Sequence, residues 1–87
     1  MSFEVLREKK GGYSKRDVLA KLDALNNLML CLEDGMPREK ALAELEKIKQ
    51  IEMHKEKGGF FGSYGFDTGD TDDYIADLLS HIEEKLR

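Results

Sequence analysis

Apolar residues recur at alternating intervals of four and three along one stretch of this chain. The five positions are Val18, Leu22, Leu25, Met29 and Leu32. This spacing is typical of a helix that packs lengthwise against another helix, as in a coiled coil. Ser14, with Asp17 three residues later, is expected to cap the start of this helix, and Gly35 to follow its end.

A second helix is predicted from Pro37 to about His54. Its apolar stripe is made of Ala41, Leu42, Leu45, Ile48 and Ile51. The turn between the two helices is very short, and Pro37 suits the first position of a helix. Residues 14–55 are therefore expected to form an antiparallel helical hairpin.

The chain changes character at residues 56–69, where glycine and aromatic residues dominate and a helix is disfavoured. We expect a loop or a short β-ribbon there, and a third helix over residues 70–87. With a basic segment at residues 1–13, the whole chain forms one small domain. The predicted fold class is mostly α: a three-helix hairpin or bundle with a short Gly/aromatic loop or β-ribbon.

A chain of 87 residues, 37% of them charged, has little material for a core. The first helix also carries more apolar surface than one seam, because Leu19, Leu28 and Leu30 lie outside it. We therefore expect oligomerisation to complete the fold, as a homodimer or a higher oligomer. The apolar positions with 4–3 spacing between residues 18 and 32, here called the seam, would carry this self-association. The alternative is that the seam is core within one chain.

The formal net charge of −4 disfavours a nucleic-acid partner. The charges are uneven, because the N-terminal segment is basic and the last twenty or so residues are acidic. Cys31 is the only cysteine, so an intrachain disulfide is excluded. The sequence begins without an apolar signal segment and has no apolar run long enough to span a bilayer. These features predict a cytoplasmic protein, with peripheral attachment to a membrane as a variant.

Residues that could carry chemistry do not have the spacing it requires. The acidic run Asp67, Asp70, Asp72 and Asp73 does not fit a calcium-binding EF-hand loop and is explained by helix capping. His54, His81 and Cys31 lack the spacing of metal ligands. We therefore predict a non-enzymatic protein without a metal or cofactor.

A short motif occurs twice, each time before a helix with an acidic first turn. The copies are Gly12-Tyr13-Ser14 and Gly65-Phe66-Asp67. In this pattern the glycine permits an unusual turn, the ring anchors it, and the polar residue caps the helix. At these residues the chain resembles the DivIVA-type proteins of bacterial cell division and polarity. The second copy, which continues with Asp70, Asp72 and Tyr74-Ile75, is the closer match.

The resemblance implies a dimeric, helical, non-enzymatic domain whose crossed loops lie at the tip of a parallel coiled coil and can contact membrane. Phe60, Phe61 and Tyr64 are the predicted partner-binding residues. The first functional hypothesis is a self-associating scaffold that binds other proteins in cell division or polarity, with the membrane surface as a further candidate partner. The alternative is a monomeric adaptor that binds one protein through its aromatic loop.

Overall fold

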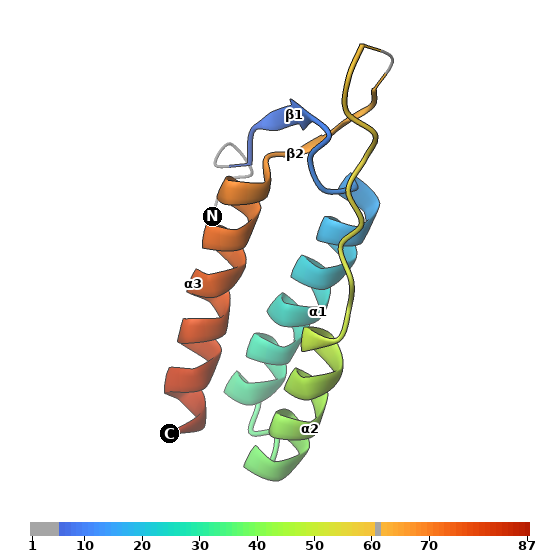
Figure 1. Ribbon diagram of the computed structural model, residues 1–87. Helices are drawn as coiled ribbons and strands as arrows, with labels where there is room; N and C mark the ends of the chain where they lie inside the picture. Colours follow the sequence, from blue (N-terminus) through green and yellow to red (C-terminus); the bar gives the residue numbers. More distant parts are fainter. Residues whose placement is uncertain (1–5, 61) are drawn as a thin grey trace.

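The computed structural model describes residues 6–60 and 62–87 of the chain. Its elements follow in the order β1 (Glu8–Lys10), α1 (Lys15–Glu33), α2 (Arg38–Lys49), β2 (Tyr64–Phe66) and α3 (Thr68–Leu86). The two strands pair as a small antiparallel ribbon above the helices (Figure 1). The predicted fold class, mostly α with three helices and a short ribbon, is confirmed.

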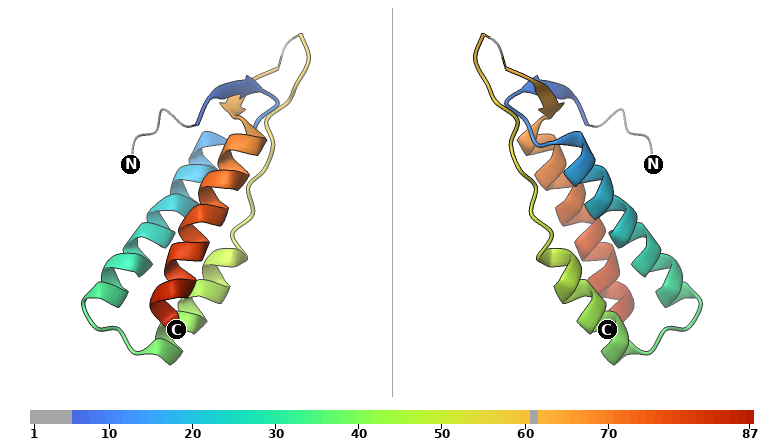
Figure 2. Two further views of the ribbon diagram at one scale, coloured as in Figure 1. Left: turned by 90° about the vertical axis from the view of Figure 1, so that its left-hand side faces the viewer. Right: turned by 90° about the vertical axis from the view of Figure 1, so that its right-hand side faces the viewer.

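α1 and α3 run side by side in the same direction, and α2 runs back against them (Figures 1 and 2). Both parallel helices have 19 residues and begin at the same end of the molecule, under the ribbon. Their N-caps share one backbone conformation, with φ −52° and ψ 125° at Ser14 and φ −52° and ψ 129° at Asp67. The same local turn therefore precedes each of these two helices.

The hydrophobic core lies among the three helices of this single chain. Val18, Leu22 and Leu25 are at most 2% exposed there, whereas Met29 and Leu32 are half-buried. The seam therefore packs inside the chain, which corrects the prediction that Val18, Leu22 and Leu25 form a surface for self-association. The remaining core residues are Leu6, Leu28, Ala41, Leu45, Ile48, Ile75, Leu78, Ile82 and Leu86.

α3 presents its buried residues with the same spacing as the α1 seam. Thr71, Ile75, Leu78 and Ile82 are buried, and they follow Val18, Leu22, Leu25 and Met29 by 53 positions each. The seam is therefore closed within the chain, because α1 packs against both α2 and α3. Thr71, which is β-branched like valine, stands at the position that matches Val18 and is fully buried. Its hydroxyl donates to the Asp67 carbonyl at 2.8 Å, so the buried polar group has a hydrogen-bond partner.

Three predicted helix boundaries differ from the structure. α2 ends at Lys49 rather than near His54, and residues 50–57 continue as extended chain and turn. α3 begins at Thr68 instead of residue 70, because Asp67 accepts the Asp70 N–H at 3.0 Å and caps the helix. Ser14 makes no side-chain cap hydrogen bond, so the predicted capping box with Asp17 is wrong.

The intrachain seam makes a prediction about stability. Leu25→Ala removes a fully buried side chain, so we expect the free energy of unfolding to fall by about 2–5 kcal/mol. Because the seam is closed within one chain, the wild-type Tm should stay constant over roughly a hundredfold range of protein concentration. Leu30→Ala, at a residue 59% exposed, is the control and should change the free energy by less than about 0.5 kcal/mol. A Tm that rises with concentration would contradict this assignment.

Candidate functional site

Residues 7–14, 54–60 and 62–66, here called the tip, gather at the end of the molecule where α1 and α3 begin (Figure 1). In the ribbon, Glu8 pairs with Phe66, Lys9 with Gly65 and Lys10 with Tyr64. Tyr13 forms one bridge with Phe66 and another with Lys55. The tip is therefore a small antiparallel sheet of four short segments, in which those of Tyr13 and Phe66 are central.

The centre of the tip is a reciprocal pair of backbone hydrogen bonds. The Tyr13 N–H donates to the Phe66 carbonyl at 2.8 Å, and the Phe66 N–H donates to the Tyr13 carbonyl at 2.9 Å. The segments approach so closely that a Cβ on Gly12 would lie 2.3 Å from the Phe66 oxygen, and one on Gly65 would lie 2.2 Å from the Tyr13 oxygen. Glycine is required at both places because no side chain fits.

Two aspartates in the first turns of the parallel helices tie the outer segments of the tip to the helices. Asp70 accepts the Arg7 backbone N–H at 3.1 Å, and its two oxygens receive the guanidinium Nε and NH2 at 2.9 and 3.0 Å. These side-chain and backbone hydrogen bonds from Arg7 lower the pKa of Asp70, and in turn the carboxylate raises the pKa of Arg7.

Asp17 makes the corresponding contact on α1. Its Oδ2 accepts the backbone N–H of His54 at 2.9 Å and lies 3.0 Å from the His54 ring Nδ1. The backbone hydrogen bond is the main cause of the lowered pKa of Asp17, and the side-chain hydrogen bond adds to it. Each helix start thus holds one extended segment through a carboxylate at its third position.

A loop with exposed aromatic residues projects from the tip beyond the ribbon (Figures 1 and 2). Phe60 is 86% exposed and Tyr64 is 56% exposed, the two highest values among large aromatic side chains in the described residues. Lys10 Nζ donates to the Phe60 carbonyl at 3.2 Å and lies 5.8 Å from the centre of the Tyr64 ring. Phe61, the third predicted partner-binding residue, lies outside the described residues.

The tip is also the basic part of the molecule. It contains five basic residues, Arg7, Lys9, Lys10, Lys55 and Lys57, and two acidic ones, Glu8 and Glu56, and hence carries a net charge of +3 with histidine neutral. Because the whole chain carries −4, the remainder carries −7. The four lysines are all exposed. Exposed aromatic rings and positive charge therefore occupy the same end.

The structure brings the predicted motif residues Gly12, Tyr13, Gly65 and Phe66 together in the middle of the tip, and Asp67 follows directly as the N-cap of α3. The Tyr13 hydroxyl donates to Asp72 at 3.0 Å. The pKa of Tyr13 is raised, mainly by partial burial and also by this hydrogen bond. Phe66 lies under the Lys15 ammonium, which is 5.7 Å from the ring centre. These motif residues build the tip, whereas Phe60 and Tyr64 face outward from it.

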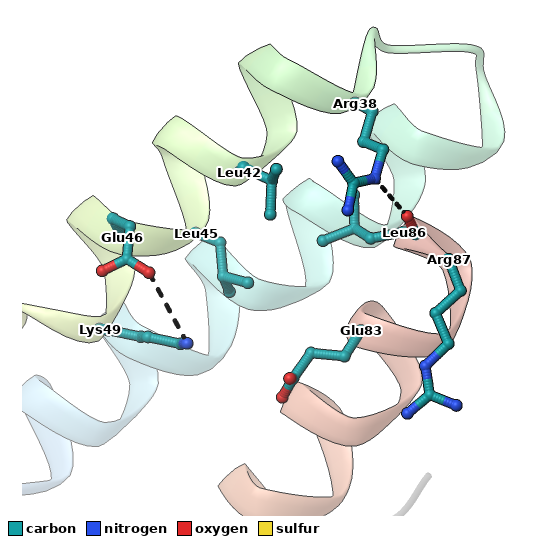
Figure 3. Close-up of a pocket in the computed structure, with 8 residues that line it drawn as sticks. All are labelled: Arg38, Leu42, Leu45, Glu46, Lys49, Glu83, Leu86 and Arg87. Atoms are coloured by element: carbon teal, nitrogen blue, oxygen red, sulfur yellow. Dashed lines mark hydrogen bonds and ion pairs between the residues drawn. The ribbon is translucent and has the colours of Figure 1, made fainter.

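Two shallow hollows lie along the helices, away from the tip. One, of about 240 Å³, lies between α2 and α3 and has Leu42, Leu45 and Leu86 among its lining residues (Figure 3). Its rim bears charges of both signs, and Glu46 and Lys49 pair across 3.8 Å. The other, of about 230 Å³, lies between α1 and α2 beside Cys31. Neither gathers charge of one sign with exposed rings, so the tip is the stronger candidate site.

Within residues 6–60 and 62–87, no group of three or more His, Cys, Asp or Glu side chains is arranged to hold a metal ion. In that same part of the chain, no helix combines the length and apolarity needed to cross a bilayer. Comparison with models of protein families, with curated proteins and with solved structures found no match for this chain. The resemblance to DivIVA-type proteins therefore stays a prediction.

Sequence reasoning missed the two carboxylate contacts that hold the tip. Asp17 and Asp70 were interpreted as helix-capping residues, yet they bind His54 and Arg7, which are 37 and 63 positions away in the sequence. Such long-range pairs have no local pattern. The available signal was that both aspartates stand three residues after the polar residue of the repeated motif.

The close approach at the centre of the tip makes a prediction. Gly65→Ala and Gly12→Ala each place a methyl group against a backbone carbonyl, so we expect each to destabilise the fold by at least about 1–3 kcal/mol in urea unfolding. Gly69→Ala is the matched control, because its Cβ would meet only the Asp67 side chain at 3.3 Å and alanine favours the helix. Equal effects at residues 65 and 69 would contradict the close approach.

The lowered pKa values of Asp17 and Asp70 predict how stability depends on pH. A carboxyl group whose pKa is lower in the folded state stabilises the fold above its unfolded pKa of about 4, and this contribution disappears as the pH falls through the folded value. Asp70→Asn should therefore lower the Tm at neutral pH and reduce the fall of Tm on acidification. Asp73→Asn, at an exposed residue of the same helix, is the control. Identical acid dependence in wild type and Asp70→Asn would contradict the prediction.

Proposed function

We propose that this protein is a non-enzymatic binding module that uses its tip to hold an acidic segment of a partner protein. The observation that carries the proposal is the joint exposure of Phe60 and Tyr64 beside lysine side chains, at one end of a rigid helix pair. Exposed aromatic residues commonly anchor protein interfaces because they bury a large area with few rotatable bonds.

The distribution of charge supports an acidic partner. Asp70 and Asp67 pair with Arg7 and Lys9, so Lys10, Lys55 and Lys57 are the lysines of the tip that would attract acidic groups. The acidic remainder of the molecule would repel such groups. Lys10 is already held beside Phe60 and Tyr64, so binding would order few additional atoms on this side of the contact. Charge would orient the partner and the rings would supply most of the affinity.

An adaptor that acts as a single chain fits the geometry better than a scaffold that self-associates through the seam. Val18, Leu22 and Leu25 are buried in the core of the single chain, so this part of the apolar surface is not exposed to a second chain. The resemblance to DivIVA-type proteins supports the same proposal, because the two motif copies and the two parallel helices take the places that two chains would take in the implied dimer. A role in cell division or polarity follows from that resemblance alone.

A negatively charged membrane surface is the competing partner, since lysines and aromatic rings also suit a lipid interface. We favour a protein partner over a membrane because the first turns of α3, which contain aspartates, lie directly below the ribbon. Asp72 and Asp73 are exposed in the first two turns of α3 and would be repelled by an anionic membrane lying flat against the tip. A narrow acidic segment can lie against the lysines without approaching them.

Binding can be tested with a short fluorescein-labelled peptide of alternating glutamate and leucine, measured by fluorescence anisotropy. We expect binding that weakens with salt, and a loss of at least about tenfold in affinity for Phe60→Ser or Tyr64→Ser, because interface aromatics commonly contribute more than 1 kcal/mol. Leu30→Ser removes an exposed apolar side chain of α1, 59% exposed, and is the matched control.

Three comparisons complete the experiment. A peptide with lysine in place of glutamate should not bind, and phosphatidylglycerol vesicles should sediment less of the protein than the acidic peptide captures at equal charge. Light scattering of the unbound protein should give the mass of one chain. Preference for vesicles, or equal affinity in Phe60→Ser and wild type, would refute the proposal.

A further inference from the structure

The two halves of the tip obey a common pattern along the chain. Tyr13 and Phe66, which exchange the central hydrogen bonds, are 53 positions apart, and the same separation holds for the N-caps Ser14 and Asp67. The same separation of 53 positions holds for Asp17 and Asp70, the aspartates that tie the tip to the helices. It holds as well for the buried seam positions of α1 and their counterparts on α3. From Gly12 to Met29, the first half of the chain is therefore matched by residues 65–82 at a constant interval.

The segments before the motif match equally well, but at a shorter interval. The Ser14 N–H donates to the His54 carbonyl at 2.7 Å, and the Asp67 N–H donates to the Arg7 carbonyl at 2.7 Å. Arg7 and His54 each give a backbone N–H to the aspartate of the opposite helix. They are therefore equivalent, although they are only 47 positions apart.

The paired residues that follow keep this interval of 47. Glu8 pairs with Phe66 as Lys55 pairs with Tyr13, and Lys9 faces Gly65 as Glu56 donates to the Gly12 carbonyl. Next come Lys10-Gly11 in the first copy and Lys57-Gly58 in the second, two identical pairs of residues. A Cβ built on Gly11 would lie 3.3 Å from the Cα of Gly58, so these equivalent glycines also meet.

The change of interval from 47 to 53 locates six additional residues in the second copy. In the first copy Gly11 is joined directly to Gly12, whereas in the second copy residues 59–64 stand between Gly58 and Gly65. These six residues include the exposed Phe60 and Tyr64. The first copy makes its turn, with the Gly12 N–H donating to the Lys9 carbonyl at 3.0 Å, without an insertion of its own, although its Gly11 N–H donates to the Ser63 carbonyl at 3.1 Å.

The added residues leave and return at one point. The Ser63 N–H donates to the Lys57 carbonyl at 2.8 Å, which closes the neck of the loop, and Gly62 N–H donates to the Gly59 carbonyl at 3.1 Å within it. Both views of Figure 2 show this loop extending past the ribbon. Its removal would leave Gly58 next to Gly65, the arrangement that Gly11 and Gly12 already adopt.

We infer that the chain is an internal duplication that pairs with itself like a two-chain dimer, and that residues 59–64 are an insertion in its second copy that binds an acidic protein segment. The binding part rests on the proposed function, whereas the duplication rests on the geometry alone. Because one copy carries the insertion, each chain offers one such site.

The first experiment removes residues 59–64 and joins Gly58 to Gly65. We expect the excised protein to keep its helical circular dichroism and the mass of one chain, to unfold within about 5 °C of the wild-type Tm, and to lose binding of the glutamate–leucine peptide by at least about tenfold. An excised chain that is unfolded, or that dimerises, would show that these residues belong to the fold and would overturn the inference.

The second experiment transplants the loop. Inserting Gly-Phe-Phe-Gly-Ser-Tyr between Gly11 and Gly12 gives the first copy the sequence that the second copy has, at the equivalent place. We expect a folded protein that binds two peptides per chain in calorimetric titration, instead of one. An insertion of equal length made of glycine and serine is the control and should leave one site. A single site in the transplanted protein, once it is shown to be folded, would overturn the inference.

The two experiments separate the inference from the proposed function. If wild type fails to bind the peptide while the excised chain folds normally, the proposed function is wrong and the duplication stands. If wild type binds and the excised chain binds equally well, the tip remains a binding module but the insertion is not its binding element.

Discussion

The reciprocal hydrogen bonds between Tyr13 and Phe66 are the contact on which the rest of this fold depends. They fix the separation and the direction of the two segments that enter α1 and α3, and so make these helices start level and run parallel. Parallel helices from one chain need a long return connection, which α2 and the extended residues after it supply. Bringing two backbones this close excludes every residue except glycine at positions 12 and 65.

This pairing also explains how a small, highly charged chain obtains a core. α1 packs against both α2 and α3, so the three helices share one core to which each contributes buried residues. The second half of the same chain covers much of the apolar surface for which the scarcity of core residues predicted a second copy. Self-association itself stays a prediction.

The elements that the sequence predicted well are those with a local signal. The 4–3 spacing of the seam, the glycine at the end of α1 and the repeated Gly-aromatic motif all depend on neighbours within one or two turns. Which helix faces the seam, and which residues Asp17 and Asp70 bind, depend on contacts across 37 or more positions, and periodicity carries no information about them. For the candidate site, Phe60 and Tyr64 were named as partner-binding residues, which stays a prediction, whereas their exposure and the lysine beside them are known from the structure.

The duplication changes how the exposed rings are understood. In a small domain every apolar side chain is expected to serve the core, so a phenylalanine that is 86% exposed is costly unless it has another role. The first copy shows that the turn closes with Lys10, Gly11 and Gly12 alone, and the second keeps the same lysine and glycines while adding a loop between them. On the proposed function, the glycines and the aspartates that bind Arg7 and His54 hold the tip, and the added rings contact the partner. This division of roles is expected if the first copy folds without a loop like the one that the second copy carries at residues 59–64.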